Sequence, residues 1–359
     1  MSLRLRVCAP LLAIAACLLV VAPAATGGTS AFSETYLAYT TGTATSPSQV
    51  WAAGAGGAPA KLLGAGEEPL LSPSGGLVAA SVSAAGSGEG PALAVYHVDG
   101  APALDYASAN SVSAIPLAWS SDSKYLAVSL ISTAVKNIAE GSSLAVIDLE
   151  TGTMTTVAHG IVEGASFAPE GSDRLAYGLT SSYQSLAPVN VHISAPDGSG
   201  ARLFTHDGRS LNPVWGAGGI AFDRERLRHL AFPAYQLWLA PAAGGAARQL
   251  THVKVNTLVS GLVPIAFSAD GLRLLAEFEG QDTSAAWTVD LSTGRVRPLT
   301  TPGRHTLQAA GISQDGTTLL VDEDSFEGPP SMGRVVTIPF DGGPARVLVA
   351  HAGQASWNE

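Results

Sequence analysis

Short apolar runs alternate with polar turns along the whole chain, and the same arrangement recurs at a nearly constant interval. In each copy an apolar run ends in a bulky side chain, a turn rich in Gly, Asp and Ser follows, and a second apolar run comes next, as in 116–128 and 263–276. The bulky side chains are Leu71, Trp119, Phe167, Trp215, Phe267 and Ile312. Their spacings of 48, 48, 48, 52 and 45 residues indicate one structural unit repeated along the chain.

Each copy continues with two further short runs that have the form of a β-hairpin. In 143–158 and 285–300, apolar and polar residues alternate on either side of a turn that contains glycine. Period-2 alternation is typical of a half-buried strand, and glycine supplies the positive φ that tight hairpin turns require. Four strands in every 45–52 residues predict an all-β fold, the β-propeller.

The two ends of the repeat region look like parts of one blade. Residues 34–41 have the pattern of a second strand without a first, whereas 355–357 match a first strand. We expect the C-terminal strand to complete the first blade and so remove an open sheet edge. This predicts a seven-bladed β-propeller of four-stranded blades over 32–359, whose first blade is shared between 32–68 and 355–359.

The first 24 residues have the pattern of an export signal. Two arginines precede an apolar run over 7–21, and Ala22-Pro23-Ala24 offers small residues at the positions that signal peptidase recognises. We expect a signal peptide over 1–24, a short linker over 25–31, and an exported protein that is secreted or held in the cell envelope. Two alternatives stay open: a retained membrane anchor, for which the run is short of the roughly 20 residues of a span, and a lipid anchor on Cys17.

Cysteine usage and charge exclude several classes of protein. Both cysteines, Cys8 and Cys17, lie within the expected signal, so the mature chain would hold no disulfide. The chain has 19 basic and 29 acidic residues, and loss of Arg4 and Arg6 would leave a net charge of −12. Nucleic acids and anionic lipids require a basic surface, so neither is an expected partner. No other segment is apolar enough to span a membrane, and we expect a monomer.

The repeat resembles that of TolB-type propellers, which are envelope relatives of the WD-repeat class. The matching segments are Trp-Ser-Ser-Asp at 119–122, Phe-Ser-Ala-Asp-Gly at 267–271, Gln-Leu-Trp at 236–238 and Asp-Leu-Ser-Thr-Gly at 290–294. The resemblance implies the fold over nearly the whole mature chain, but TolB carries an additional N-terminal domain and six blades. The blades also resemble the non-catalytic propellers of prolyl-oligopeptidase-type enzymes and some seven-bladed polysaccharide lyases.

Local catalytic motifs are missing from the sequence. It contains no Gly-x-Ser-x-Gly elbow, His-Glu-x-x-His pair, cysteine-based zinc pattern or P-loop. We therefore assign no catalytic residue, cofactor or metal, while a site assembled from separate blades remains open.

Acidic residues form the first candidate binding site. They are Asp322, Glu323 and Asp324 in the seventh blade, with Glu277 and Glu279 in the sixth. Both groups should lie where a second strand runs into its loop, on one face of adjacent blades. Such carboxylates could bind Ca²⁺ or a cationic partner, or act as an acid/base pair; the alternative is a solvated loop on an acidic protein.

Two other patterns have weaker functional interpretations. Histidines follow the last strand of five blades, at positions 159, 206, 252, 305 and 351, where they could form a metal ring or simply suit the turn. Arg224, Arg226 and Arg228 alternate along one strand, which favours either an anion site or an exposed hairpin.

These observations favour a non-enzymatic binding or scaffold protein of the bacterial cell envelope, with a protein or envelope component docked on the loop face or at the mouth of the central channel. The alternative is a propeller enzyme, such as a metal-dependent polysaccharide lyase or hydrolase.

Overall fold

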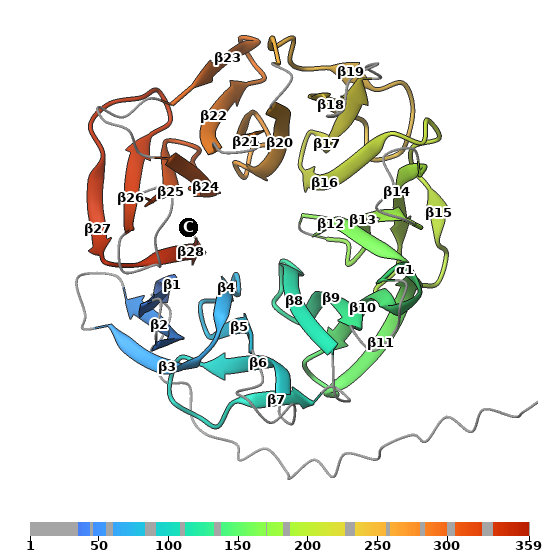
Figure 1. Ribbon diagram of the computed structural model, residues 1–359. Coiled ribbons are helices and arrows are strands. Elements are labelled where there is room, and N and C mark those ends of the chain that lie inside the picture. The colour runs from blue at the N-terminus through green and yellow to red at the C-terminus, as the bar shows by residue number, and fades with distance from the viewer. Residues whose placement is uncertain are drawn as a thin grey trace, which may run out of the picture. The chain divides into compact units, whose positions relative to one another are not determined.

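Strands form nearly all of the regular structure, and they are arranged as seven antiparallel blades around one axis (Figure 1). The computed structural model describes residues 35–43, 46–54, 60–82, 91–107, 112–132, 138–169, 171–181, 187–226, 234–255, 259–280, 284–299, 306–324 and 333–358. They all belong to one unit, Phe32–Glu359. The expected signal peptide and linker lie outside the described residues.

The blades follow one another in chain order, each with its innermost strand first. Blade 1 contains β28 (Gly353–Trp357), β1 (Thr35–Thr43), β2 (Ser46–Gly54) and β3 (Lys61–Ala65). Blade 2 contains β4 (Glu67–Leu71), β5 (Leu77–Ser81), β6 (Pro91–His97) and β7 (Leu104–Ala107). Blade 3 contains β8 (Val112–Trp119), β9 (Tyr125–Ser132), β10 (Ser142–Asp148) and β11 (Thr153–His159). Blade 4 contains β12 (Ile161–Phe167), β13 (Leu175–Thr180), β14 (Val189–Ser194) and β15 (Arg202–Leu203).

The remaining three blades repeat this order. Blade 5 contains β16 (Ser210–Gly216), β17 (Gly219–Arg226), β18 (Ala234–Ala240) and β19 (Arg248–Gln249). Blade 6 contains β20 (Val259–Phe267), β21 (Arg273–Gly280), β22 (Ser284–Asp290) and β23 (Arg295–Pro298). Blade 7 contains β24 (Thr306–Ile312), β25 (Thr318–Asp324), β26 (Arg334–Pro339) and β27 (Arg346–Ala350). Blades 5 and 6 are linked by one parallel pairing, Tyr235 with Gly261.

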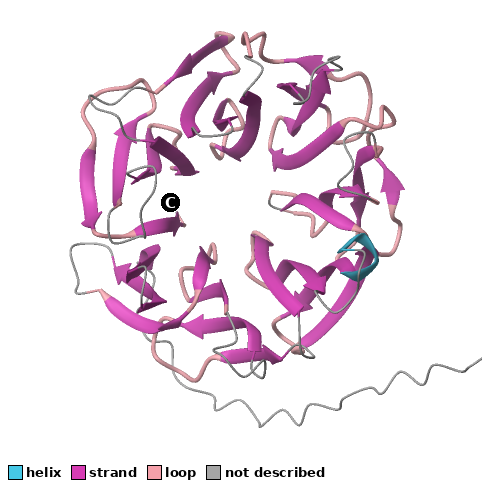
Figure 2. Ribbon diagram, in the orientation of Figure 1, coloured by secondary structure: helices cyan, strands magenta, loops and turns pink. Residues whose placement is uncertain are grey.

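One short helix interrupts this all-β pattern in the described part of the chain. It is α1 (Ile138–Gly141), in the connection between β9 and β10 (Figure 2). No helix among the described residues is both long and apolar enough to cross a membrane. The prediction of a seven-bladed all-β propeller is confirmed.

The core lies between blades, and second strands contribute to it from both of their sides. Leu126 and Val128 of β9 pack with residues of blade 2, whereas Ala127, between them in sequence, packs with residues of blade 4. All three are fully buried. Successive side chains of a strand point to opposite faces, so a strand between two neighbours must be apolar at every position. This explains why the second strands read as continuous apolar runs.

The bulky residue that ends each innermost strand also reaches into the preceding blade. Trp119 is buried, and its indole N–H donates a hydrogen bond of 3.0 Å to the carbonyl oxygen of Leu70 in blade 2. A buried indole must satisfy its N–H, and this bond does so across the boundary between two blades. The repeated bulky positions are therefore structural.

The closure of the ring by the C-terminal strand is confirmed. β28 pairs antiparallel with β1, with Leu37 opposite Trp357 and Thr40 opposite Gly353. The Thr40 hydroxyl donates to the Gly353 carbonyl at 3.0 Å, and the backbone N–H of Leu71 in blade 2 donates to the Ser356 hydroxyl at 2.9 Å. β28 therefore contacts both its own blade and the next one.

Removal of β28 should weaken the whole ring. Deletion of 353–359 would leave β1 as an unpaired innermost edge and expose the buried faces beside it. We expect the melting temperature to fall by several degrees, since the deletion removes several buried contacts and about 1 kcal/mol corresponds to roughly 1–2 °C in a domain of this size. Circular dichroism would measure this, with removal of Glu359 alone as the control. Equal melting temperatures for the two truncations would contradict the role of β28 in stability.

Candidate functional site

The two faces of the ring differ in the parts of the strands that reach them. We call the loop face the side where innermost strands begin and second strands end; Glu163, Glu225, Glu279 and Glu323 lie near this side. The turn face is the opposite side, where the tight turns between first and second strands lie, including those at Asp122 and Asp270.

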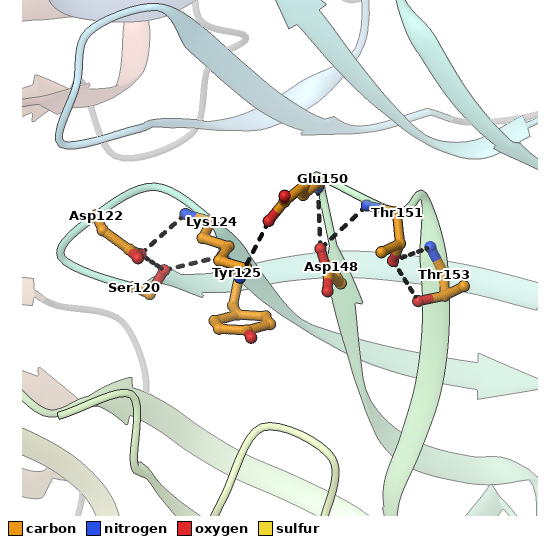
Figure 3. A network of polar contacts seen from close by, with 8 residues as sticks. All are labelled: Ser120, Asp122, Lys124, Tyr125, Asp148, Glu150, Thr151 and Thr153. Atoms are coloured by element: carbon orange, nitrogen blue, oxygen red, sulfur yellow. Dashed lines mark hydrogen bonds and ion pairs between the residues drawn. The ribbon is translucent and has the colours of Figure 1, made fainter. Parts of the chain in front are cut away.

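Carboxylates of the turn face are used by the turns themselves. In blade 3 the Ser120 hydroxyl donates to Asp122 at 2.6 Å, and the backbone N–H of Lys124 donates to the same oxygen at 3.0 Å (Figure 3). Lys124 forms an ion pair with Glu150 at 3.1 Å. The bond from Ser120 is the main reason that the pKa of Asp122 lies below its usual value.

The same serine–aspartate turn recurs in blades 6 and 7. Ser268 donates to Asp270 at 2.6 Å, and Ser313 donates to Asp315 at 2.7 Å. These hydrogen bonds again lower the pKa values of both aspartates. The repeated acids of these serine–aspartate turns are thus structural.

Glu277, one of the predicted binding residues, joins two blades. One carboxylate oxygen accepts a hydrogen bond from the Ser284 hydroxyl, and the other accepts the backbone N–H of Ala309 in blade 7 at 2.9 Å. Burial raises the pKa of Glu277, and these two bonds partly oppose the rise. Its role as a ligand for an external partner stays a prediction.

Asp322 and Glu323 are also held by internal contacts. Asp322 accepts the backbone N–H of Ala355 in the closing strand at 2.9 Å, and Glu323 forms an ion pair with Arg334. Both acids are buried. The side chain of Asp324 lies outside what the structure describes. Binding of a partner by these three residues remains a prediction, but the first two already have a structural role.

Asp223, which the sequence interpretation missed, occupies the same place in blade 5 as Glu277 and Asp322 in blades 6 and 7. Each acid lies three residues after the second-strand residue that pairs with the bulky anchor. These anchor pairs are Trp215 with Ile220, Phe267 with Leu274, and Ile312 with Leu319. Three consecutive blades thus carry a carboxylate at one equivalent position.

Asp223 differs from its two counterparts in making no hydrogen bond to the next blade. Its side chain is fully buried, and neither carboxylate oxygen makes a hydrogen bond to a described residue. In blade 7 the N–H that Glu277 binds belongs to Ala309. The equivalent residue of blade 6, which would face Asp223, is Pro264, and proline has no N–H to donate. The carboxylate that joins blades 6 and 7 is Glu277. Its equivalent between blades 5 and 6 is Asp223, which makes no corresponding hydrogen bond.

Burial changes the ionisation of Asp223. It raises the pKa of the carboxyl group to about 8, and the charges of Glu279 and Glu163 add to the rise. Asn212 opposes the rise, although its amide makes no hydrogen bond of normal geometry to either oxygen. A carboxyl group without donors in a low-dielectric environment is more stable when neutral, so Asp223 is mainly protonated at pH 7.

Tyr235 of β18 lies directly opposite Glu225 on β17, and it also pairs with Gly261, which lies opposite Glu279 on β21. Its pKa is raised first by burial and then by the charges of Asp223, Glu225, Glu163 and Glu279. The ring is only partly buried. The charges of four acids from blades 4, 5 and 6 thus act on the ionisation of one phenol, and we call these five residues the Tyr235 cluster.

The three glutamates of the Tyr235 cluster lack counter-charges in direct contact. Within the described ranges, the side chains of Glu163, Glu225 and Glu279 form no ion pair or hydrogen bond. Burial raises the pKa of each; for Glu279 the neighbouring Glu277 and Glu163 add to this, whereas Arg209 counteracts it at Glu225. Of the predicted site, only Glu279 belongs to this cluster.

The described residues cover the other two sequence patterns only in part. His159, His206, His252 and His351 are exposed, and His305 lies outside the described residues. Among the residues that the structure describes, no group of three His, Cys, Asp or Glu is placed to hold a metal ion. Arg224 pairs with Asp207 at 2.7 Å and stacks on Trp238 at 4.3 Å, while the side chains of Arg226 and Arg228 are outside the described part.

Comparison with known proteins shows a likeness of fold. No protein-family model matches the chain, and no curated protein sequence does. The chain is similar to TolB from Acinetobacter baumannii, with a TM-score of 0.53 and 15% identity over 93% of this chain and 68% of that one. It is also similar to a prolyl endopeptidase, with a TM-score of 0.61 and 16% identity over 91% of this chain and 51% of the other.

A third similar structure is an oligogalacturonate lyase in complex with manganese. Its TM-score is 0.54, with 13% identity over 89% of this chain and 86% of the lyase. The resemblance to TolB-type propellers expected from the sequence is confirmed for the fold. Because binding proteins and enzymes share this architecture, function must be argued from the site.

The buried Asp223 predicts a specific dependence of stability on pH. The pKa of Asp223 is about 8 in the folded state and near 3.9 in the unfolded chain. Between about pH 4 and 8 the unfolded chain therefore loses a proton that the folded protein keeps, so the stability of the folded state falls as pH rises. The slope due to this one group is at most about 1.4 kcal/mol per pH unit. Asp223→Asn removes it, so the variant should gain stability relative to the wild type as pH rises from 5 to 8.

Urea unfolding at pH 5, 6, 7, 8 and 9 would measure this difference. Asp173→Asn serves as the control, because Asp173 is an exposed acid in a turn of blade 4 on the other face. Curves for Asp223→Asn and the wild type that stay parallel from pH 5 to 8 would show that Asp223 ionises normally.

Proposed function

We propose that this chain is an exported, non-enzymatic binding or scaffold protein of the bacterial cell envelope, whose partner docks on the loop face. The Tyr235 cluster is the observation that carries this proposal. The aspartates of the serine–aspartate turns accept hydrogen bonds within their own turns, whereas the side chains of Glu163, Glu225 and Glu279 have no such partners among the described residues. Clustered like charges without counter-ions cost folding energy and favour a positively charged partner.

Export rests on the N-terminal pattern rather than on the ring. Arg4 and Arg6, the apolar run over 7–21 and the small residues at 22–24 support secretion or an envelope location. The TolB-like fold is consistent with an envelope location. If Cys17 were lipidated instead, the exported protein would stay attached to a membrane surface.

The alternative is a metal-dependent propeller enzyme acting on polysaccharide. The observation in its favour is the likeness in fold to an oligogalacturonate lyase in complex with manganese, which extends over most of both chains. An enzyme of this kind would hold a metal when purified without chelator. A metal at one hundred times its Kd would add about 2.7 kcal/mol of stability.

Chemical crosslinking in intact cells, followed by mass spectrometry, would test the binding proposal. We expect Glu163→Gln with Glu279→Gln to reduce recovery of the crosslinked partner several-fold, because both residues lie at the strand ends next to the loop face. Asp173→Asn with Glu150→Gln is the matched control, since it also removes two negative charges, but from the turn face. Equal recovery in both double variants would overturn docking at the Tyr235 cluster.

The same purified protein would decide between binding protein and metal enzyme. Metal content after purification without chelator and the melting temperature before and after EDTA are the two measurements. A stoichiometric metal together with a lower melting temperature in EDTA would replace the scaffold proposal by the enzyme.

A further inference from the structure

We propose that a cavity between blades 3 and 4, on the loop face, binds a neutral saccharide of one or two rings. The cavity has a volume of about 460 Å³ and is lined by α1, by the ends of β11 and β13, and by residues next to them. Sites for small ligands are usually about 300–1,000 Å³ in volume. This site is separate from the Tyr235 cluster, and the inference goes beyond the proposed function without resting on it.

The backbone where the chain passes from blade 3 to blade 4 forms one wall of the cavity. Gly160 donates its N–H to the Ser142 carbonyl at 2.9 Å, and the next residue, Ile161, pairs with Thr180 at the end of β13. Gly160 has a φ of 130°, and a β-carbon on it would lie 2.9 Å from the Thr180 carbonyl oxygen. Glycine is therefore required for this close approach. Because contacts to both blades fix the wall, little ordering is needed when a ligand binds.

The polar groups around the cavity suit a ligand that both donates and accepts hydrogen bonds. Glu140 of α1 supplies a carboxylate, which accepts, while His159 at the end of β11 and Ser181 after β13 can each do both. All three residues are exposed, so a ligand can reach them from solvent. In Figure 1, α1 lies where blades 3 and 4 meet. Sugar hydroxyl groups, which donate and accept, match all three side chains.

Two apolar residues line the same cavity. Leu179 is partly buried at the end of β13, and Pro188 is exposed just before β14. Their C–H groups can pack against the C–H groups of a sugar ring. A few polar groups that fix orientation beside apolar contact surface are typical of sites for small molecules.

The charge of the lining disfavours other classes of ligand. Among the described residues that line the cavity none is lysine or arginine, and Glu140 would repel a phosphate, a sulfate or an acidic sugar. A cation would pair with one exposed carboxylate, and exposed ion pairs contribute little. In the described ranges no three His, Cys, Asp or Glu side chains are placed to hold a metal ion. A neutral ligand rich in hydroxyl groups fits best.

Isothermal titration calorimetry of the mature protein at pH 7 tests this inference. The neutral probes are maltose, cellobiose, lactose and diacetylchitobiose, with digalacturonic acid as the acidic probe and spermidine as the cationic one. We expect at least one neutral disaccharide to bind saturably at one site per chain. Glu140→Gln should weaken this binding tenfold or more, because it removes a hydrogen bond to a charged acceptor.

Two further variants show whether binding occurs in this cavity. Ser181→Trp places an indole in the cavity and should abolish binding, whereas Glu150→Gln, the same change as Glu140→Gln but on the turn face, should leave the affinity unchanged. Glu140 and Ser181 are exposed, so the melting temperatures of these variants should stay close to that of the wild type. This measurement separates loss of binding from loss of fold.

Three results would overturn the inference. They are no saturable binding of any neutral disaccharide, an affinity that neither Glu140→Gln nor Ser181→Trp changes, and tighter binding of digalacturonic acid or spermidine than of every neutral probe. The proposed function is decided separately by crosslinking. Recovery of the crosslinked partner should depend on Glu163 and Glu279 but not on Ser181, so either proposal can fail while the other stands.

Discussion

The structure depends on the burial of every blade between two neighbours. A four-stranded blade has two apolar faces, and second strands such as β9 direct alternate side chains to the blade before and the blade after. Full burial of a Leu or Val side chain contributes about 1.5–3 kcal/mol, and this is available only while both neighbours are present. The ring must therefore close, and β28 closes it by pairing with β1. With no cysteine beyond Cys17, apolar contact and backbone pairing must supply the stability.

This constraint confines polar chemistry to the two faces of the ring and to the joints between blades. Turn-face acids such as Asp122 shape their own turns, and acids at the joints accept backbone N–H groups of the next blade, as Glu277 does from Ala309. Such an acid needs a backbone N–H at the matching position of the neighbouring strand. Where that strand carries Pro264, the matching donor is absent and Asp223 remains unpaired. The Tyr235 cluster thus arises at the one of three equivalent acidic joints that lacks its hydrogen bond.

The fold could be predicted from the sequence because its signal is repeated. Anchors such as Trp119 and Phe167 and their glycine turns recur at a steady interval, so each copy supports the others, and the unmatched end strands predict closure. The site could be predicted only in part. Glu279 was found because it belongs to a visible acidic run, but Asp223 lies beside a run of arginines and the turn before it is shorter than in other blades. The equivalence of Asp223 to Glu277 becomes visible only when the strand registers are compared. In the sequence alone, the residue as far from Trp215 as Glu277 is from Phe267 is Glu225.

An unpaired buried acid needs a reason to be present, because a neutral side chain of similar shape would avoid its cost. Glu277 and Asp322 recover that cost through hydrogen bonds to the next blade. Asp223 makes no such hydrogen bond to the next blade, and its pKa of about 8 means that the cost of ionising its carboxyl group grows across the neutral range. Sites where local stability is given up are expected to be functional sites, and a carboxyl group with a strongly raised pKa is one sign of such a site. If Asp223 had no role beyond packing, asparagine could replace it without loss, whereas replacement of Glu277 or Asp322 would weaken a hydrogen bond to the next blade.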